Sequence, residues 1–378
     1  MATLAAPAVP HGIGPTNAKE SSNSASNLSD GSSGFKVYGS VFKVDARYQF
    51  LNPLGKGSYG VVCAARDRET GQHIAIKKVS PMAKRSVDAK HTLRELLLLQ
   101  FLGNHPNVIS MHNVSTNLKD DELYIVMDLM DTDLHRVIQS SQSLSDAHVK
   151  YFLHQLLRGV KYLHGHGVLH RDLKPGNLLL SKTCQLKVEL MLAPNGCYDG
   201  AVDMWSVGCI LAEILGRKAL FPGKNFLHQL SLIFDVIGTP PPESTTRIKS
   251  AQAQRFLKNL GKKPKVPFRS LFPNASDDAI DLLDKLLEFD PTKRISAQDA
   301  LAHPYMLSIE SKKAKSGSAM EPPQPSCRVD FSFDSNKKLT KMDLRALIVK
   351  EVDAFRKATE AHSSGAMENE ADLSEETI

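Results

Sequence analysis

Residues 170–177 read His-Arg-Asp-Leu-Lys-Pro-Gly-Asn. The stretch places a carboxylate at Asp172 and a carboxamide at Asn177, with Lys174 between them. This spacing matches the catalytic-loop pattern H-R-D-x-x-x-x-N. A basic loop that merely follows a helix is the plain alternative, and the motifs on both sides of the stretch argue against it.

The residues before this loop have the pattern of an amphipathic helix. Apolar residues form a stripe over residues 146–164, and Ser145 is in place to cap the N-terminus. Periodicity predicts further helices over residues 87–102, 202–215, 225–236, 277–289 and 297–301. Strands are predicted over residues 48–54, 60–67, 73–79, 108–114 and 123–129. The predicted strands thus come mostly before the predicted helices, which favours an α+β protein. The length of 378 residues suggests two lobes plus tails.

A glycine-rich pattern, Gly55-x-Gly57-x-x-Gly60-x-Val62, lies at the turn between the first two strands. In dinucleotide-binding folds a helix follows such glycines, whereas here the chain continues as a strand. The pattern therefore favours a flexible lid over nucleotide phosphates, where glycine lets the backbone approach phosphate oxygens. Taken alone, the stretch fits an ordinary hairpin turn equally well.

Lys77 ends the predicted strand that follows the glycines. Its spacing from Gly60 suits contact with nucleotide phosphates, and Glu95 on the next helix is in place to pair with it. A solvated ion pair of little energetic value is the alternative. The next residue, Lys78, is expected to be exposed at the surface.

Charge, cysteine content and hydropathy argue against a nucleic-acid-binding, a disulfide-bonded and a membrane-spanning protein. The net charge of +6 and the pI near 8.9 are modest, and opposite charges are interspersed, so no nucleic-acid surface is expected. The five cysteines lack C-x-x-C spacing, which predicts reduced thiols inside a cell. No apolar run reaches the length of a membrane span, which predicts a soluble protein.

Taken together, these motifs resemble the protein kinases, and more narrowly the mitogen-activated protein (MAP) kinases. The narrower resemblance rests on residues 76–81, 92–95, 128–134 and 221–224, and it covers residues 44–355. It implies a two-lobed kinase fold with an antiparallel-sheet N-lobe and a mainly helical C-lobe. The expected layout is a disordered tail (1–43), the N-lobe and hinge (44–130), the C-lobe (131–306), an extension that returns to the N-lobe (307–356) and an acidic disordered tail (357–378).

The resemblance also implies a site for ATP and Mg²⁺. Asp172 would accept the proton of the attacking hydroxyl, Lys174 would screen the transferring phosphoryl group, and Asn177 would bind the metal. Backbone groups of Asp128 and Met130 would contact the adenine edge. Met127 would guard the pocket, although core packing alone also suits a methionine. The implied nucleotide-binding residues are Leu54, Gly55, Gly57, Gly60, Val62, Ala75, Lys77, Glu95, Met127, Asp128 and Met130.

A MAP kinase would phosphorylate Ser/Thr-Pro sites of protein substrates in a signalling cascade. The resemblance implies activation by an upstream dual-specificity kinase, a monomer, a location in the cytoplasm or nucleus, and neither nucleic acid nor membrane as a partner.

One family segment is missing. Residues 185–188 resemble the strand that leads into D-F-G, but the next residue, Glu189, resembles the last letter of A-P-E. The sequence contains no D-F-G, no T-x-Y and no complete A-P-E. Loss of the metal-binding aspartate predicts a rate loss on the order of a hundredfold or more.

Three interpretations of this gap stay open: a kinase that works through its remaining residues, a pseudokinase that only binds nucleotide or partners, and a splice variant or gene-model error. The sharp boundaries on both sides favour the third origin.

The gap also has a geometric consequence. Glu189 and Arg294 resemble the partners of a buried ion pair, and Asp203 resembles a structural acceptor for the catalytic loop. Joining Val188 directly to Glu189 brings their Cα atoms to about 3.8 Å, whereas the ends of the missing segment are expected to lie well apart. Glu189 is therefore predicted either to leave Arg294 or to drag the preceding strand away.

Overall fold

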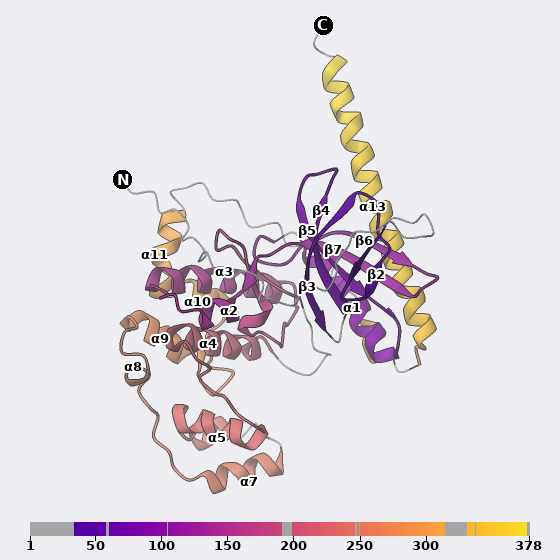
Figure 1. Cartoon of the computed structure of the whole chain (residues 1–378). Coiled ribbons are helices and arrows are strands. Elements are labelled where there is room, and N and C mark those ends of the chain that lie inside the picture. The colour runs from indigo at the N-terminus through magenta and orange to yellow at the C-terminus, as the bar shows by residue number, and fades with distance from the viewer. Residues whose placement is uncertain are drawn as a thin grey trace. The chain divides into compact units, whose positions relative to one another are not determined.

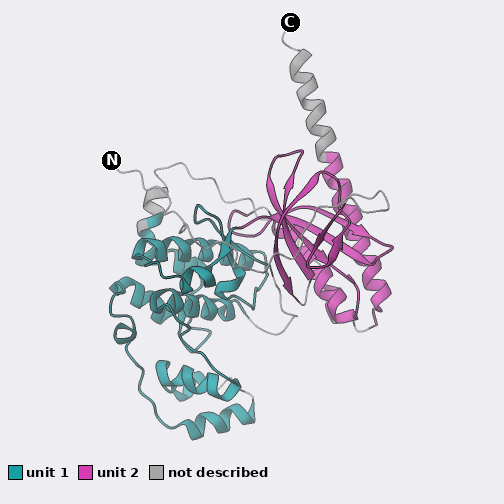
Figure 2. Ribbon diagram, viewed as in Figure 1, with its two compact units in different colours: residues 1–10, 131–324 teal, residues 11–130, 325–378 magenta. Residues whose placement is uncertain are grey.

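The computed structural model describes residues 34–57, 60–103, 105–190, 199–245, 248, 250–313, 331–336 and 338–375. These residues form two compact units that divide between Met130 and Asp131, and the described residues after 330 belong to the same unit as residues 34–130 (Figure 2).

The unit that contains residues 34–130 is built on a five-stranded antiparallel sheet of order β3-β4-β5-β7-β6. Its strands are β3 (Tyr48–Gly57), β4 (Gly60–Asp67), β5 (His73–Val79), β6 (Met111–Asn117) and β7 (Glu122–Asp128). Four of the five predicted strands are confirmed within a few residues. The fourth begins later than predicted, because Val108 and Ile109 are buried in the loop before β6 and imitate a strand pattern.

A short hairpin covers one face of this sheet. Strands β1 (Phe35–Val37) and β2 (Ser40–Phe42) pair with each other, and Phe35, Val37 and Phe42 pack in the same buried cluster as Tyr124. The prediction of a disordered tail through residue 43 is therefore wrong for residues 35–42. Strands of three residues are too short for an alternating pattern to reveal them.

Two helices that are distant in sequence lie side by side next to the sheet (Figure 1). Helix α1 (Ser86–Leu102) confirms the predicted helix, and α13 (Lys341–Glu375) packs against α1 and β6 through the fully buried side chains of Leu344, Ile348 and Val352. The backbone of α13 is helical through residue 375. The prediction of a disordered tail over residues 357–378 is therefore wrong for residues 357–375. That segment is rich in Ala and Glu, which favour helix.

The unit that begins at Asp131 is mainly helical. Helix α3 (Asp146–Gly165) has the predicted cap, because the Ser145 hydroxyl accepts from the His148 amide, and its apolar stripe is buried. The unit also contains a small antiparallel sheet of order β10-β9-β8, made of β8 (Thr132–Asp133), β9 (Leu178–Leu180) and β10 (Leu186–Val188). The predicted helices correspond to α1, α3, α4, α5, α9 and α10.

The remaining elements of this unit are α2 (Leu134–Gln139), the 3₁₀ turn η1 (Pro175–Asn177), α4 (Ala201–Gly216), α5 (Phe226–Ile237), α6 (Pro242–Thr245), α7 (Ala251–Leu260), α8 (Phe268–Leu271), α9 (Asp277–Leu286), α10 (Ala297–Leu301) and α11 (Pro304–Lys313). Helix α12 (Ser332–Ser335) belongs to the unit with the larger sheet. In the described parts of the chain, no helix is both long enough and apolar enough to cross a bilayer.

Candidate active site

The loop 170–177 is held in place by one buried carboxylate from α4. Asp203, which is 1% exposed, accepts from the backbone amides of His170 (2.9 Å) and Arg171 (2.7 Å) and from His164 Nε2 (2.8 Å). Arg171 has a left-handed backbone with φ of 65°, a conformation that costs a non-glycine residue free energy and persists only where its surroundings fix it. The structural role predicted for Asp203 matches these contacts. Sequence analysis missed His164, whose only signal was its place at the end of the helix before the loop.

Asp203 gives a prediction for stability. Burial alone would raise its pKa, but the hydrogen bonds from His164, Arg171 and His170 outweigh burial and lower the pKa below its ordinary value of 3.8. Its contribution is therefore fully present above pH 3.8 and is lost as the pH falls through the lower folded value. Asp203→Asn should lower the free energy of unfolding at pH 7 by about 3 kcal/mol.

Urea titrations from pH 7 to pH 2.5 check this prediction, and the difference between the two proteins should shrink as the pH falls below 3.8. A difference that stays constant with pH would contradict the assignment.

His170 joins the loop to the strand that follows it. Its Nδ1 accepts from the Asp172 amide (3.2 Å) and its Nε2 donates to the carbonyl oxygen of Glu189 (2.7 Å). Burial lowers the pKa of His170, so the ring is neutral at pH 7 with its proton on Nε2. In addition, the Glu189 amide donates to the carbonyl oxygen of Asn177 (3.0 Å). The residue after β10 is thus attached to both ends of the loop.

The three predicted catalytic side chains meet within the loop. Asp172 Oδ2 accepts from Lys174 Nζ (2.9 Å) and from Asn177 Nδ2 (3.0 Å), and Asn177 Nδ2 also donates to the Asp172 carbonyl oxygen (2.8 Å). Across the part of the chain that the structure describes, neither Asp172 Oδ1 nor Asn177 Oδ1 has a hydrogen-bond partner. The contacts within the loop therefore leave one carboxylate oxygen of Asp172 and the amide oxygen of Asn177 available for the predicted hydroxyl and metal contacts.

Lys77 and Glu95 form the predicted ion pair, with Lys77 Nζ 2.5 Å from Glu95 Oε1 and side chains only 10% and 21% exposed. The pair is therefore not a freely solvated one. In the register of the sheet, Val62 lies opposite Lys77, and Ala75 lies opposite Met127. Directly opposed residues share a face of the sheet, so these four side chains line the same face.

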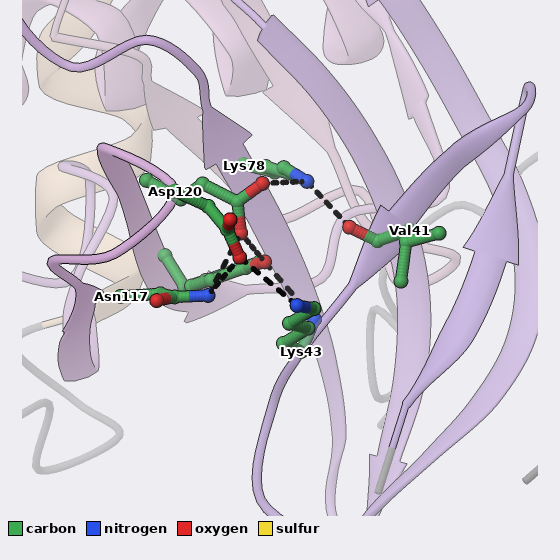
Figure 3. Close-up of polar contacts among 7 residues, drawn as sticks. Val41, Lys43, Lys78, Asn117 and Asp120 are labelled. Carbon is green, nitrogen blue, oxygen red and sulfur yellow. Dashed lines mark hydrogen bonds and ion pairs between the residues drawn. The ribbon is translucent and has the colours of Figure 1, made fainter. Parts of the chain in front are cut away.

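Lys78 is not exposed, contrary to the prediction. It is 4% exposed, pairs with Glu122 Oε1 (2.6 Å) and donates to the carbonyl oxygen of Val41 in the hairpin (Figure 3). Neighbouring Lys43 pairs with Asp120 (2.9 Å). Successive residues of a strand point to opposite faces, and the hairpin covers the face that receives Lys78. Lys78 therefore has a structural role, whereas Lys77 faces the predicted nucleotide side.

The three glycines of the glycine-rich turn have different reasons to be glycine. Gly60 has φ of +141°, and a Cβ there would lie 2.1 Å from the carbonyl oxygen of Lys78. A Cβ at Gly55 or Gly57 would have no atom of the described residues within 4 Å, and neither residue has a positive φ. Folding therefore requires glycine at position 60 alone, and the open space at the other two positions fits the approach of a phosphate group.

This difference can be tested by substitution. Gly60→Ala should lower the free energy of unfolding by about 3 kcal/mol, because the backbone of β5 must move away from the new methyl group. Gly57→Ala should lower it by less than about 1 kcal/mol. Urea denaturation of both variants checks the prediction, and equal losses would contradict the assignment.

The remaining predicted nucleotide contacts are Leu54, Asp128 and Met130. Leu54, in β3, is 40% exposed. The Asp128 amide donates to the carbonyl oxygen of Ser110 (3.1 Å), while its carboxylate accepts from the Ser110 amide (2.7 Å) and lies 3.0 Å from His112 Nε2. These contacts anchor the end of β7, and Met130 follows two residues later. The backbone contacts of Asp128 and Met130 with adenine stay a prediction.

Arg294 does not pair with Glu189. Its guanidinium donates to the carbonyl oxygens of Ala201 (2.5 Å), Glu288 (2.9 Å) and Phe289 (3.1 Å). Burial lowers its pKa, and the acidic side chains that oppose this effect are Asp199, Glu288 and Asp290. Meanwhile β10 stays paired with β9. Of the two predicted consequences of the gap, the structure agrees with the first: Glu189 leaves Arg294 and the strand keeps its place.

Comparison with known proteins places this geometry in a family. The family model "Protein kinase domain" matches residues 48–193 and 189–306. The chain is 43% identical over 330 residues to mitogen-activated protein kinase 5 of Arabidopsis thaliana, which covers 79% of this chain and 85% of that protein.

The chain belongs to the protein kinase family, and within it to the MAP kinases. Mitogen-activated protein kinase 6 of Oryza sativa subsp. japonica is 41% identical over 352 residues, covering 85% of this chain and 91% of that protein. Extracellular signal-regulated kinase 1 of Dictyostelium discoideum is 42% identical over 367 residues, which covers 87% of this chain and 66% of that protein. MAP kinases are serine/threonine protein kinases that act in signalling cascades, and a protein kinase domain implies ATP and a divalent metal.

The residues present fit a nucleotide better than they fit its metal. Open space at Gly55 and Gly57 and the buried Lys77–Glu95 pair suit phosphate groups. For the metal, Asn177 Oδ1 is in place, but kinases use a second ligand from an aspartate after the strand that corresponds to β10. Here that strand runs into Glu189 and the buried Leu190. Among the described residues, no group of three or more His, Cys, Asp or Glu side chains could hold a metal ion.

Proposed function

We propose that this chain is a proline-directed serine/threonine MAP kinase that still binds ATP but transfers its phosphoryl group at a severely reduced rate. The observation that carries the proposal is the continuous path from β10 into Glu189 and Leu190, beside an otherwise well-ordered catalytic loop. The loop holds Asp172, Lys174 and Asn177 together, whereas the segment that would supply the aspartate ligand is absent from the sequence.

The comparisons support a deletion within the domain. The two parts of the family match overlap at residues 189–193, as expected when a stretch of the domain is missing at that point. The alignment with the Arabidopsis kinase has 330 positions, but it covers only 79% of the 378 residues of this chain, which is fewer than 330 residues. At the remaining positions the relative has residues and this chain has gaps. The same deletion removes the site for an upstream dual-specificity kinase.

The remaining side chains would divide the work as follows. Lys77, oriented by Glu95, would bind the α- and β-phosphates, and Val62, Ala75 and Met127 would pack on the base. Bound Mg²⁺ would supply charge neutralisation of the phosphates. Asp172 Oδ1 would accept a hydrogen bond from the substrate hydroxyl, and Lys174 would screen negative charge. Asn177 alone would hold the metal weakly, which is why the transfer is slow.

Calorimetric titration with ATP, with and without Mg²⁺, tests the binding half of this proposal. We expect ATP to bind in both conditions, with Mg²⁺ improving the affinity by less than about fivefold, because one neutral ligand attracts a cation weakly. Absence of binding to the folded protein in both conditions would overturn the proposal. A much larger effect of Mg²⁺ would show that another carboxylate completes the metal site.

A pseudokinase that uses its nucleotide or its surface only to bind partners is the second candidate, favoured by the same missing aspartate. Such a protein would bind other proteins without phosphorylating them. We also propose a location in the cytoplasm or nucleus, protein substrates with Ser/Thr-Pro sites and a monomeric state, on the strength of the family alone.

A further inference from the structure

One turn of helix α1 is held by the segment that precedes α13. The Arg94 guanidinium pairs through two nitrogens with the Asp334 carboxylate, with Nε 2.9 Å from Oδ2. One turn earlier, Lys90 Nζ donates to the carbonyl oxygens of Asp334 (2.8 Å) and Asn336 (3.0 Å). Residues four apart on a helix share a face, so both cations of this face of α1 are bound by residues 334–336.

The pair is buried, which makes it hard to break. The side chains of Arg94 and Asp334 are each 6% exposed, and the adjacent Phe333 is 7% exposed. Among the described residues Arg94 Nη1 has no hydrogen-bond partner, so Asp334 provides the charge compensation that the structure shows for this guanidinium. A buried charge that loses its partner is strongly unfavourable. Helix α1 therefore cannot move away from residue 334 without a large loss of stability.

A second anchor holds α13 at a different place. Arg345 pairs with Asp121 (2.7 Å) and donates to the carbonyl oxygen of Leu118 (2.8 Å), both in the turn between β6 and β7. This pair is 25% and 31% exposed and does not involve α1. The two anchors thus have similar chemistry but different attachment points, one on the helix and one on the sheet.

The residue next to Arg94 is Glu95, the partner of Lys77. We propose that Asp334 is a positioning residue: acting through Arg94, it fixes α1 so that Glu95 stays paired with Lys77 in a chain that has no activation segment. The proposal rests on the proposed function, because it concerns the nucleotide contact made by Lys77. It assigns the C-terminal extension an indirect part in nucleotide binding.

The test compares Asp334→Ala and the shape-conserving Asp334→Asn with Arg345→Ala as the matched control. Two quantities are measured on the full chain: the affinity for ATP, and the hydrogen-exchange rates of the α1 backbone amides. Both Asp334 variants should exchange α1 amides at least about tenfold faster. They should also bind ATP about tenfold more weakly. Arg345→Ala should change either quantity by less than about twofold.

Three outcomes would overturn the proposal: unchanged exchange of α1 in both Asp334 variants, faster exchange without loss of affinity, or equal effects in Arg345→Ala. Failure of the proposed function looks different, because the unmodified chain would then bind no ATP. In that case faster α1 exchange confined to the Asp334 variants would still support the positioning role, and unchanged exchange would refute it.

Discussion

Inserting the missing segment between Val188 and Glu189 should raise phosphate transfer to a Ser/Thr-Pro peptide by about a hundredfold or more. The segment would be the one that an aligned relative carries from its D-F-G through the A-P of its A-P-E. The expected gain follows from the rest of the machinery being present: Asp203 orders the catalytic loop, and Asp172 and Asn177 each keep an oxygen without a partner among the described residues. Only the second metal ligand and the substrate platform would be new.

The measurement is kcat/KM for the peptide, before and after treatment with an active upstream kinase. The matched control carries the same insertion with the D-F-G aspartate replaced by asparagine, which keeps the segment and removes the metal ligand. This control should fall back toward the unmodified chain. A folded, ATP-binding insertion protein with no gain in turnover would contradict the account, as would an asparagine control that is equally active.

The second large effect concerns two adjacent lysines. Lys77→Met should weaken ATP binding by about thirtyfold or more, because it removes the charge that faces the phosphates and leaves Glu95 without its partner. Lys78→Met should leave ATP affinity within about twofold, because its side chain lies on the other face of β5. It should instead lower the free energy of unfolding by about 3 kcal/mol, because Glu122 stays buried without its cation.

Calorimetry and urea denaturation of the same two samples separate the two roles. Each variant is the control for the other, since both replace a strand lysine by the same apolar residue. Loss of ATP affinity in Lys78→Met, or an unchanged affinity in Lys77→Met, would show that the nucleotide is not bound on the face that carries Val62 and Ala75.

Local signals predicted the helices and strands well where the pattern was long. The buried stripe of α3 runs from Val149 to Leu163, which is about four helical turns. The spacing from Gly60 to Lys77 to Glu95 identified an ion pair that the structure contains. The roles that the sequence assigns to Asp172, Lys174 and Asn177 stay predictions.

Other features depend on contacts between distant residues, which no local pattern reveals. Lys78 was expected at the surface because a lone lysine is usually solvated, but the hairpin at residues 35–42 covers it and Glu122 pairs with it. The ion pair between Arg94 and Asp334 could not be predicted for the same reason, because its two members are 240 residues apart in the sequence. Arg294 resembles one member of a buried ion pair with Glu189, but its guanidinium donates to backbone carbonyl oxygens instead.

We propose that the catalytic loop of this chain is intact while its metal site is incomplete. The most direct measurement is Mg²⁺-dependent phosphate transfer from ATP to a Ser/Thr-Pro peptide by the chain as it stands, compared with Asp172→Asn. We predict that ATP binds but that transfer is near background, so that Asp172→Asn lowers it by less than about threefold. Clear turnover that Asp172→Asn abolishes would contradict the claim and would show that another carboxylate, with Glu189 the nearest after β10 in the chain, completes the metal site.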